Sequence, residues 1–193
     1  CNMKLALKEY WENLKVEYEA TYNASIFSDY DVLKQYAERF RTYLITLMCE
    51  YSNDVDVACT LATVEQVLRH EENSIQLLEE FLRKYIEELS DTEKARVYTN
   101  LAFYYNDEGS IKEYDYLSAA VKLDSPYIET YRGLALYHFS SYADKGSIEA
   151  LKKSLCAFEK GRIVSNDYEM NFGYAVCLFE LKKYEKAKAI FEE

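Results

Sequence analysis

The sequence predicts an all-α chain built from antiparallel pairs of helices. Apolar residues recur at helical spacing along almost all of the 193 residues, and one group of residues recurs 33 positions further on. Only 5 Gly and 1 Pro occur, whereas a β-sandwich or barrel needs many turns rich in both. A hydrophobic content of 49% also excludes a disordered chain.

Four helices are predicted in the first half of the chain. They cover residues 3–22, 28–51, 55–70 and 74–89. Ser28, followed three residues later by Asp31, is the expected N-cap of the second helix, and Asn53-Asp54 breaks the chain and caps the third. We interpret residues 1–90 as an N-terminal helical hairpin or bundle. An alternative interpretation of the second part of this region is one degenerate repeat.

Helix-start signals become regular after residue 90. Ser90 with Glu93 is a capping box, Gly109-Ser110 ends one helix and caps the next with Glu113 at its third position, Ser125-Pro126 places a cap before Pro, and Asn166 precedes Glu169. The connections are short, about two to eight residues, so successive helices are expected to pack antiparallel. The whole chain then holds about ten helices.

Three segments of the second half share one spacing of large and small residues. They are Tyr98-x2-Leu101-Ala102-x2-Tyr105, Tyr131-x2-Leu134-Ala135-x2-His138 and Asn171-x2-Tyr174-Ala175-x2-Leu178. Ala102 and Ala135 are 33 residues apart, as are Phe158 and Phe191 in the second helices. The step from Ala135 to Ala175 is 40, so an insertion is expected between the paired helices, around residues 141–146.

This pattern resembles the tetratricopeptide repeat (TPR) family, in which small residues let paired helices approach closely. Ser154 and Ala187 are the matching small residues of the second helices, whereas Glu113 or Tyr114 stands at that place in the first repeat. The resemblance implies a right-handed α-solenoid in which residues 91–193 form three TPR-like repeats, the last one incomplete. Residues 1–90 match the pattern poorly.

In the TPR family the first helices of the repeats line a concave face that receives a peptide or a partner helix. The resemblance therefore implies a groove made by one set of side chains from each repeat: Arg96, Thr99, Phe103 and Asn106; Glu129, Arg132, Leu136 and Phe139; Glu169, Phe172, Val176 and Phe179. Thr99 and Phe103 occupy places where some TPRs carry a Lys/Asn clamp for a terminal carboxylate, which disfavours that ligand.

The expected function is that of a non-enzymatic scaffold that binds a protein or peptide segment. The alternative is the peptide-sensing module of a bacterial signalling or transcription regulator. The C-terminal helix carries Ile190 and Phe191 on a face that a further repeat normally covers. Self-association through this helix is expected if the chain ends at Glu193; the alternatives are a natural protein that continues beyond Glu193 or cover by the N-terminal helices.

The charge balance argues against nucleic acid and anionic membrane as partners. The chain has 23 Lys and Arg against 34 Asp and Glu, a formal net charge of -11. Binding to phosphates depends on Lys and Arg, and no basic stripe is present.

The five cysteines and two histidines do not stand at metal-ligand spacings, so we expect no metal and no cofactor. Four of the cysteines fall in apolar helical stretches and are expected to be reduced and buried. His138 takes a packing position, so no catalytic Cys–His pair is expected. A cytoplasmic location is favoured; the alternatives at the start of the chain are a lipid anchor on Cys1 or a non-native Cys1-Asn2 before Met3.

Overall fold

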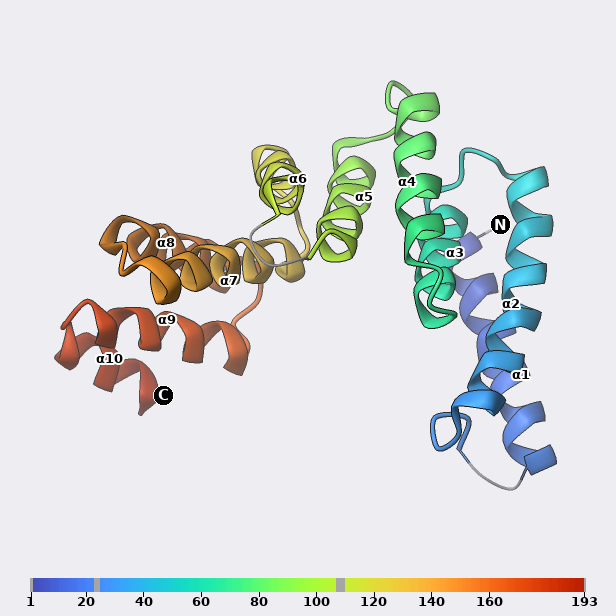
Figure 1. Ribbon diagram of the computed structural model, residues 1–193, viewed down its shortest axis with the longest axis horizontal. Helices are drawn as coiled ribbons and strands as arrows, with labels where there is room; N and C mark the ends of the chain where they lie inside the picture. Colours follow the sequence, from blue (N-terminus) through green and yellow to red (C-terminus); the bar gives the residue numbers. More distant parts are fainter. Residues whose placement is uncertain (1, 23–24, 107–109, 193) are drawn as a thin grey trace. The chain divides into compact units, whose positions relative to one another are not determined.

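The computed structural model describes residues 2–22, 25–106 and 110–192, which contain ten α-helices and no strand (Figure 1). The predicted all-α class is therefore confirmed. The helices are α1 (Met3–Tyr22), α2 (Tyr30–Glu50), α3 (Val55–Val67), α4 (Glu71–Tyr85), α5 (Asp91–Tyr104), α6 (Ile111–Lys122), α7 (Ile128–Lys145), α8 (Ile148–Val164), α9 (Tyr168–Glu180) and α10 (Tyr184–Phe191). Cys1 and Gly109, which carried sequence-based expectations, lie outside the described residues.

The chain divides into two compact units, residues 1–88 and 89–193. In the first unit, aromatic side chains join α1 to α2. Trp11 meets Tyr36 edge-on with ring centroids 4.3 Å apart, and Tyr10 stacks on Tyr43 at 3.8 Å. The Tyr36 side chain is fully buried, and its hydroxyl donates a hydrogen bond to the backbone carbonyl of Trp11. Burial raises the pKa of Tyr36 well above its ordinary value, so this donor stays protonated.

Helices α3 and α4 form a close pair through two small residues. Ala62 and Ser74 are both fully buried, and the Ser74 hydroxyl donates to the Ala62 carbonyl at 3.0 Å. In the second unit the Ser154 hydroxyl donates to the Ala135 carbonyl at 2.8 Å in the same way. The small residues therefore bring helix backbones close together, which is the role that the sequence pattern predicts for them.

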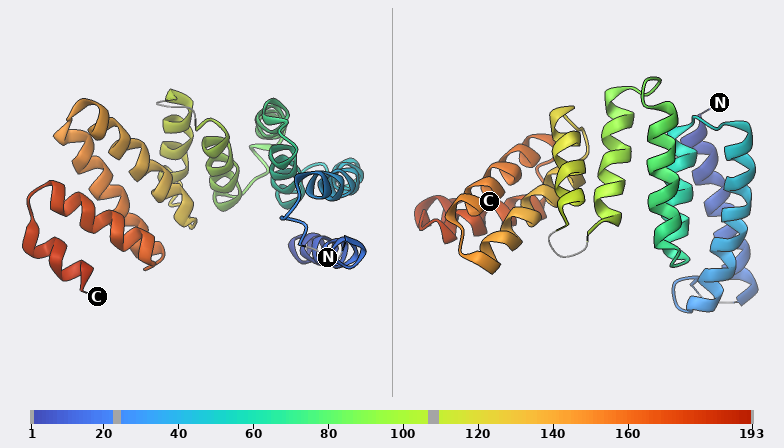
Figure 2. Two further views of the ribbon diagram at one scale, coloured as in Figure 1. Left: turned by 60° about the horizontal axis from the view of Figure 1, so that its bottom comes forward. Right: turned by 45° about the horizontal axis from the view of Figure 1, so that its top comes forward.

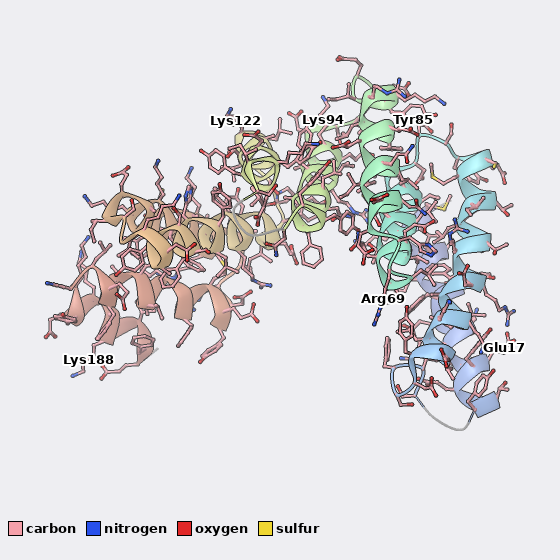
Figure 3. The ribbon with its side chains drawn as sticks, viewed as in Figure 1. Glu17, Arg69, Tyr85, Lys94, Lys122 and Lys188 are labelled. Carbon is pink, nitrogen blue, oxygen red and sulfur yellow. The ribbon has the colours of Figure 1, made fainter. Side chains whose placement is uncertain are left out.

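A buried ion pair also holds the first unit together. Glu65 of α3 is 3% exposed and accepts hydrogen bonds from Arg41 Nε at 2.6 Å and from His70 Nδ1 at 2.8 Å. Burial acts to raise the pKa of this carboxyl, but the hydrogen bonds from Arg41 and His70 outweigh it and lower the pKa. The carboxylate thus links α2 to the end of α3. At the far end of the unit, the hydroxyl of Tyr85 on α4, a residue labelled in Figure 3, donates to the Ser52 hydroxyl.

In the second unit, α5–α6, α7–α8 and α9–α10 are antiparallel pairs, and both views in Figure 2 show α7 beside α8 and α9 beside α10. Ala102, Ala135 and Ala175 are each at most 1% exposed, and so is Ala187 on α10. Gly173 of α9 lies directly against the Phe158 ring of α8, so that a larger residue there would require the ring or the helix to shift. The repeat spacing thus predicts the helix pairs and their contacts correctly.

Two predicted N-caps are shifted by one residue. Asp29, not Ser28, caps α2 by accepting a hydrogen bond from the Asp31 amide at 2.8 Å. Asp167, not Asn166, caps α9 in the same way. In both cases two neighbouring residues are able to cap, and the backbone selects the second one.

The other two predicted caps make different contacts. Ser110 precedes α6 without a side-chain capping bond. Ser125 lies ahead of α7, which begins at Ile128, and its hydroxyl is bonded to Thr130 at 2.7 Å. The capping box of Ser90 and Glu93 is present as predicted.

The expected insertion at residues 141–146 lengthens α7. This helix runs for 18 residues and ends at Lys145, where Gly146 adopts the left-handed conformation with φ 65°. The inserted residues therefore form additional helix in place of a loop. Earlier in the chain, the expected connection at residues 71–73 forms the first turn of α4, where acidic residues are favourable next to the helix N-terminus.

The cysteines differ partly from expectation. Cys59 and Cys177 are buried, but Cys49 and Cys156 are exposed because both face solvent from amphipathic helices. These four described cysteines are free thiols. No helix among the described residues is long and apolar enough to cross a bilayer, and no cluster of three or more metal-ligating side chains occurs among them.

Candidate partner-binding groove

A groove of about 840 Å³ lies between α5, α6 and α7 of the second unit. Lys94 and Lys122 mark α5 and α6 in Figure 3. Helix α5 contributes one wall, α7 the other, and α6 the part between them. The lining residues are Thr99, Ala102, Phe103, Asn106, Glu113, Leu117, Glu129, Arg132, Gly133, Leu136, Tyr137, Ser140, Ser141, Asp144 and Lys145.

Two exposed apolar side chains face this groove from opposite walls. Phe103 of α5 is 71% exposed and Leu136 of α7 is 54% exposed. Each directly follows the small buried residue of its repeat, so the same register that buries Ala102 and Ala135 exposes Phe103 and Leu136. Exposed apolar side chains in a surface groove are typical of protein-binding sites.

Arg132 is held by carboxylates of the following repeat. Its Nη2 atom lies 2.9 Å from Glu169 and 3.7 Å from the capping residue Asp167. Its Nε atom is buried and has no hydrogen-bond partner among the described residues. Glu169 therefore acts on the groove indirectly, by fixing one end of the guanidinium group.

Thr99 lines the groove with its hydroxyl already engaged. The Thr99 hydroxyl donates to the Ala95 carbonyl at 2.8 Å and lies 2.7 Å from the Thr130 hydroxyl, which in turn bonds to Ser125. This buried chain ties α5 to the start of α7. Thr99 thus shapes the wall and has little capacity left for a ligand.

Glu113 is the charged residue most deeply placed in the groove. It is 8% exposed, lies in the first turn of α6, and has no hydrogen bond or ion pair with any described residue. Burial raises the pKa of its carboxyl. The carboxylate also contributes to raising the pKa of the neighbouring Tyr137, after the larger effect of burial.

Six of the twelve residues predicted from the repeat register line this groove. They are Thr99, Phe103, Asn106, Glu129, Arg132 and Leu136. Phe139 instead packs partly buried in the core of the second unit, with its ring 5.8 Å from that of Tyr142. Arg96 lies half-buried on α5, and it also forms contacts within the protein.

The predicted residues of the third repeat lie on α9 and do not line this groove, although Glu169 reaches its residue Arg132. Phe172 is 47% exposed and contacts Phe191 of α10, whereas Phe179 contacts Tyr184. Val176, which stands between Phe172 and Phe179 in the sequence, is half-buried. These side chains form a separate aromatic surface on the α9–α10 pair.

Sequence reasoning did not select Glu113 or the residues 140–145 as part of the groove. In the sequence, Glu113 stands out only as a departure from the small residue expected there, and its position predicts a role in helix capping. Residues Ser140, Ser141, Asp144 and Lys145 enter the groove because the insertion lengthens α7.

His138 belongs to the packing around the groove. Its ring meets those of Tyr114 and Tyr137 edge-on, each with centroids 5.7 Å apart. Burial, with a smaller effect from Lys153, lowers its pKa. A neutral imidazole between two aromatic rings fits the packing role that its repeat position predicts.

Comparison with solved structures identifies the architecture. A crystal structure of MamA matches with a TM-score of 0.57 at 19% identity, covering 83% of this chain and 91% of that one. A MamA structure from Desulfovibrio magneticus matches at 0.55 and 16% identity, covering 84% and 89%. The TPR protein TTC0263 from Thermus thermophilus matches at 0.54 and 15% identity, covering 94% and 88%. This chain has the TPR fold.

These identities are low, so the likeness establishes the fold alone. No protein-family model and no curated protein sequence matches the chain. The TPR fold agrees with the sequence resemblance. What the groove binds has to be argued from its own residues.

Proposed function

We propose that this TPR protein is a non-enzymatic scaffold that binds an extended peptide segment of a partner protein between α5 and α7. The observation that carries the proposal is the pair of exposed apolar side chains, Phe103 and Leu136, on facing walls of one groove. A peptide that covers both removes apolar surface from water, which is the main favourable contribution in most protein associations.

The polar lining supports a peptide in particular. Asn106, Ser140 and Ser141 stand along the walls beside the apolar residues. Their amide and hydroxyl groups both donate and accept hydrogen bonds, which suits the alternating N–H and C=O groups of an extended backbone. A groove with apolar contacts and neutral polar groups can thus bind one strand of polypeptide along its length.

The test is selection of peptides from a random 12-residue library displayed on phage, using the whole chain as bait. Binding of the selected peptides is then measured with the wild type, with Phe103→Ser/Leu136→Ser, and with Phe179→Ser as a control on α9. We expect the double variant to weaken binding at least tenfold, since a truncated anchor commonly costs about 2 kcal/mol. Both changed side chains are exposed, so the melting temperature should stay within about 2 °C.

Equal affinity of the selected peptides for the wild type and the double variant would place the binding site elsewhere. Failure to select any peptide that depends on Phe103 and Leu136 would also refute the proposal. The Phe179→Ser variant separates the groove from the aromatic surface of α9–α10, because Phe179 is as exposed as Leu136, at 54%.

A further inference from the structure

Glu113 is a buried carboxylate that the described part of the protein leaves without a partner. It is 8% exposed on α6, its side chain lines the groove, and no described residue donates a hydrogen bond to it. Glu65, the comparably buried carboxylate of the first unit, accepts hydrogen bonds from both Arg41 and His70. Buried charged groups are normally paired, so an unpaired one that faces a groove is the feature to explain.

The other charges of the groove do not supply the missing partner. Arg132 is paired with Glu169 and Asp167, and Lys145 lies at the C-terminal end of α7. Glu129 and Asp144 add two further carboxylates to the lining. A ligand therefore meets more negative than positive charge in the part of the groove that Arg132 does not neutralise.

The chemistry that satisfies such a site is a cation with several N–H donors. A Lys ammonium carries three donors and an Arg guanidinium five, and hydrogen bonds to a carboxylate are roughly twice as strong as neutral ones. Both side chains have an apolar stem that packs well against residues such as Phe103 and Leu136. Apolar walls with a carboxylate between them fit the shape and the charge of these two side chains.

We propose that Glu113 is the specificity determinant of the groove and receives one Lys or Arg side chain of the bound peptide. This inference rests on the proposed peptide-binding function and names the class of segment that is bound. The incoming cation supplies N–H donors to a carboxylate that has no donor among the described residues of the free protein. Binding energy thus depends on the presence of a positive charge at one position of the segment.

The experiment continues from the library selection. We expect Lys or Arg at one fixed position in most peptides whose binding depends on Phe103 and Leu136. For one such peptide with Lys, affinity is measured for the parent and for a version with norleucine, which keeps the stem and removes the charge. Glu113→Gln should weaken the parent at least tenfold and leave the norleucine peptide within about twofold.

Two further variants serve as controls. Asp115→Asn removes an exposed carboxylate from the same helix outside the groove and should leave both affinities unchanged. Glu113→Asp keeps the charge on a shorter side chain and should restore part of the preference for Lys. The Glu113→Gln variant should melt at or above the temperature of the wild type at pH 7, because it removes an unpaired buried charge.

Groove-dependent peptides without an excess of Lys or Arg, or equal weakening of the Lys and norleucine peptides by Glu113→Gln, would overturn this inference while peptide binding stands. A lower melting temperature of Glu113→Gln with unchanged affinity would likewise overturn it and assign Glu113 to the stability of α6. Absence of any peptide that depends on Phe103 and Leu136 would refute both the inference and the function on which it rests.

Discussion

Replacing Gly173 with Ala tests the packing between consecutive repeats. A Cβ atom at this position would lie 2.3 Å from Cζ and 2.4 Å from Cε1 of Phe158, which is itself 4% exposed. Normal carbon contacts are about 3.5–4.0 Å, so the ring or the helix has to move by more than about 1 Å. Overpacking costs about 1–3 kcal/mol, whereas Ala gains about 1 kcal/mol over Gly in a helix. Because the added Cβ atom would lie so close to a buried ring, the overpacking cost should fall in the upper part of that range, about 2–3 kcal/mol, and we expect a net loss of about 1–2 kcal/mol.

Gly133 provides a matched control, because it stands two residues before Ala135 as Gly173 stands two before Ala175. A Cβ atom added to Gly133 would lie 3.0 Å from the Leu117 side chain, a flexible group that can give way. The higher helix propensity of Ala over Gly then sets the change in stability, and Gly133→Ala should be neutral or stabilising by about 0.5 kcal/mol.

Thermal unfolding followed by far-UV circular dichroism measures both variants. The single Trp, Trp11, lies in the first unit, so its fluorescence would not report on these changes. A loss of about 1–2 kcal/mol lowers the melting temperature of a unit of this size by roughly 5–10 °C. Gly173→Ala should also cost less in a Phe158→Leu background. Equal melting of the two Gly→Ala variants would refute the packing described for α8 and α9.

Three further predictions concern other parts of the chain. Glu65→Gln should destabilise the first unit by about 1–3 kcal/mol at pH 7, since it breaks a buried pair. Because the pKa of Glu65 is lowered in the folded state, the difference in stability between the two proteins should shrink as the pH falls below about 4. Urea unfolding curves at several pH values measure this difference. Thiol labelling followed by peptide mapping should modify Cys49 and Cys156 quickly and the two buried thiols only in denaturant; uniform slow labelling of all four would contradict their placement. Self-association through α10 should use the exposed ring of Phe191, and light scattering should therefore find a larger species for the wild type than for Phe191→Glu. Equal masses of the two proteins would refute it.

The sequence predicts the helices well because their causes are local. Apolar periodicity gives α1 with the same bounds as in the structure, and the box of Ser90 and Glu93 marks the start of α5. The predicted caps are wrong where two candidates are adjacent, as with Ser28 and Asp29 or Asn166 and Asp167, because both residues of each pair are able to cap a helix. The repeat spacing predicts the pairing, since the small residues act between neighbouring helices.

The site was predictable in part, for a different reason. A repeat register assigns Phe103 and Leu136 to the open face, because each repeat has the same inward and outward positions. It does not predict where the groove ends, since that depends on the length of α7. It also assigns Phe139 to the groove, although the ring packs partly into the core. The exposure of Cys156 likewise depends on which face of α8 meets its neighbours.

Glu113 shows most clearly where sequence reasoning stops. A Glu at the third position of a helix is a common capping residue, so the sequence alone predicts only a local role for Glu113. Only the arrangement of α5, α6 and α7 shows that the carboxylate is buried, faces a groove and lacks a partner among the described residues. The relevant signal in the sequence is the missing small residue of the first repeat.

Site-specific photocrosslinking tests most directly whether the groove between α5 and α7 binds a peptide. A photoreactive phenylalanine analogue replaces either Leu136 in the groove or Phe179 on α9, two positions of equal exposure. A labelled peptide from the library selection is added, irradiated and followed by mass. We predict a crosslink from position 136 that an excess of unlabelled peptide abolishes, and none from position 179. Crosslinking at 179 alone, or equally at both positions, would contradict the groove as the binding site.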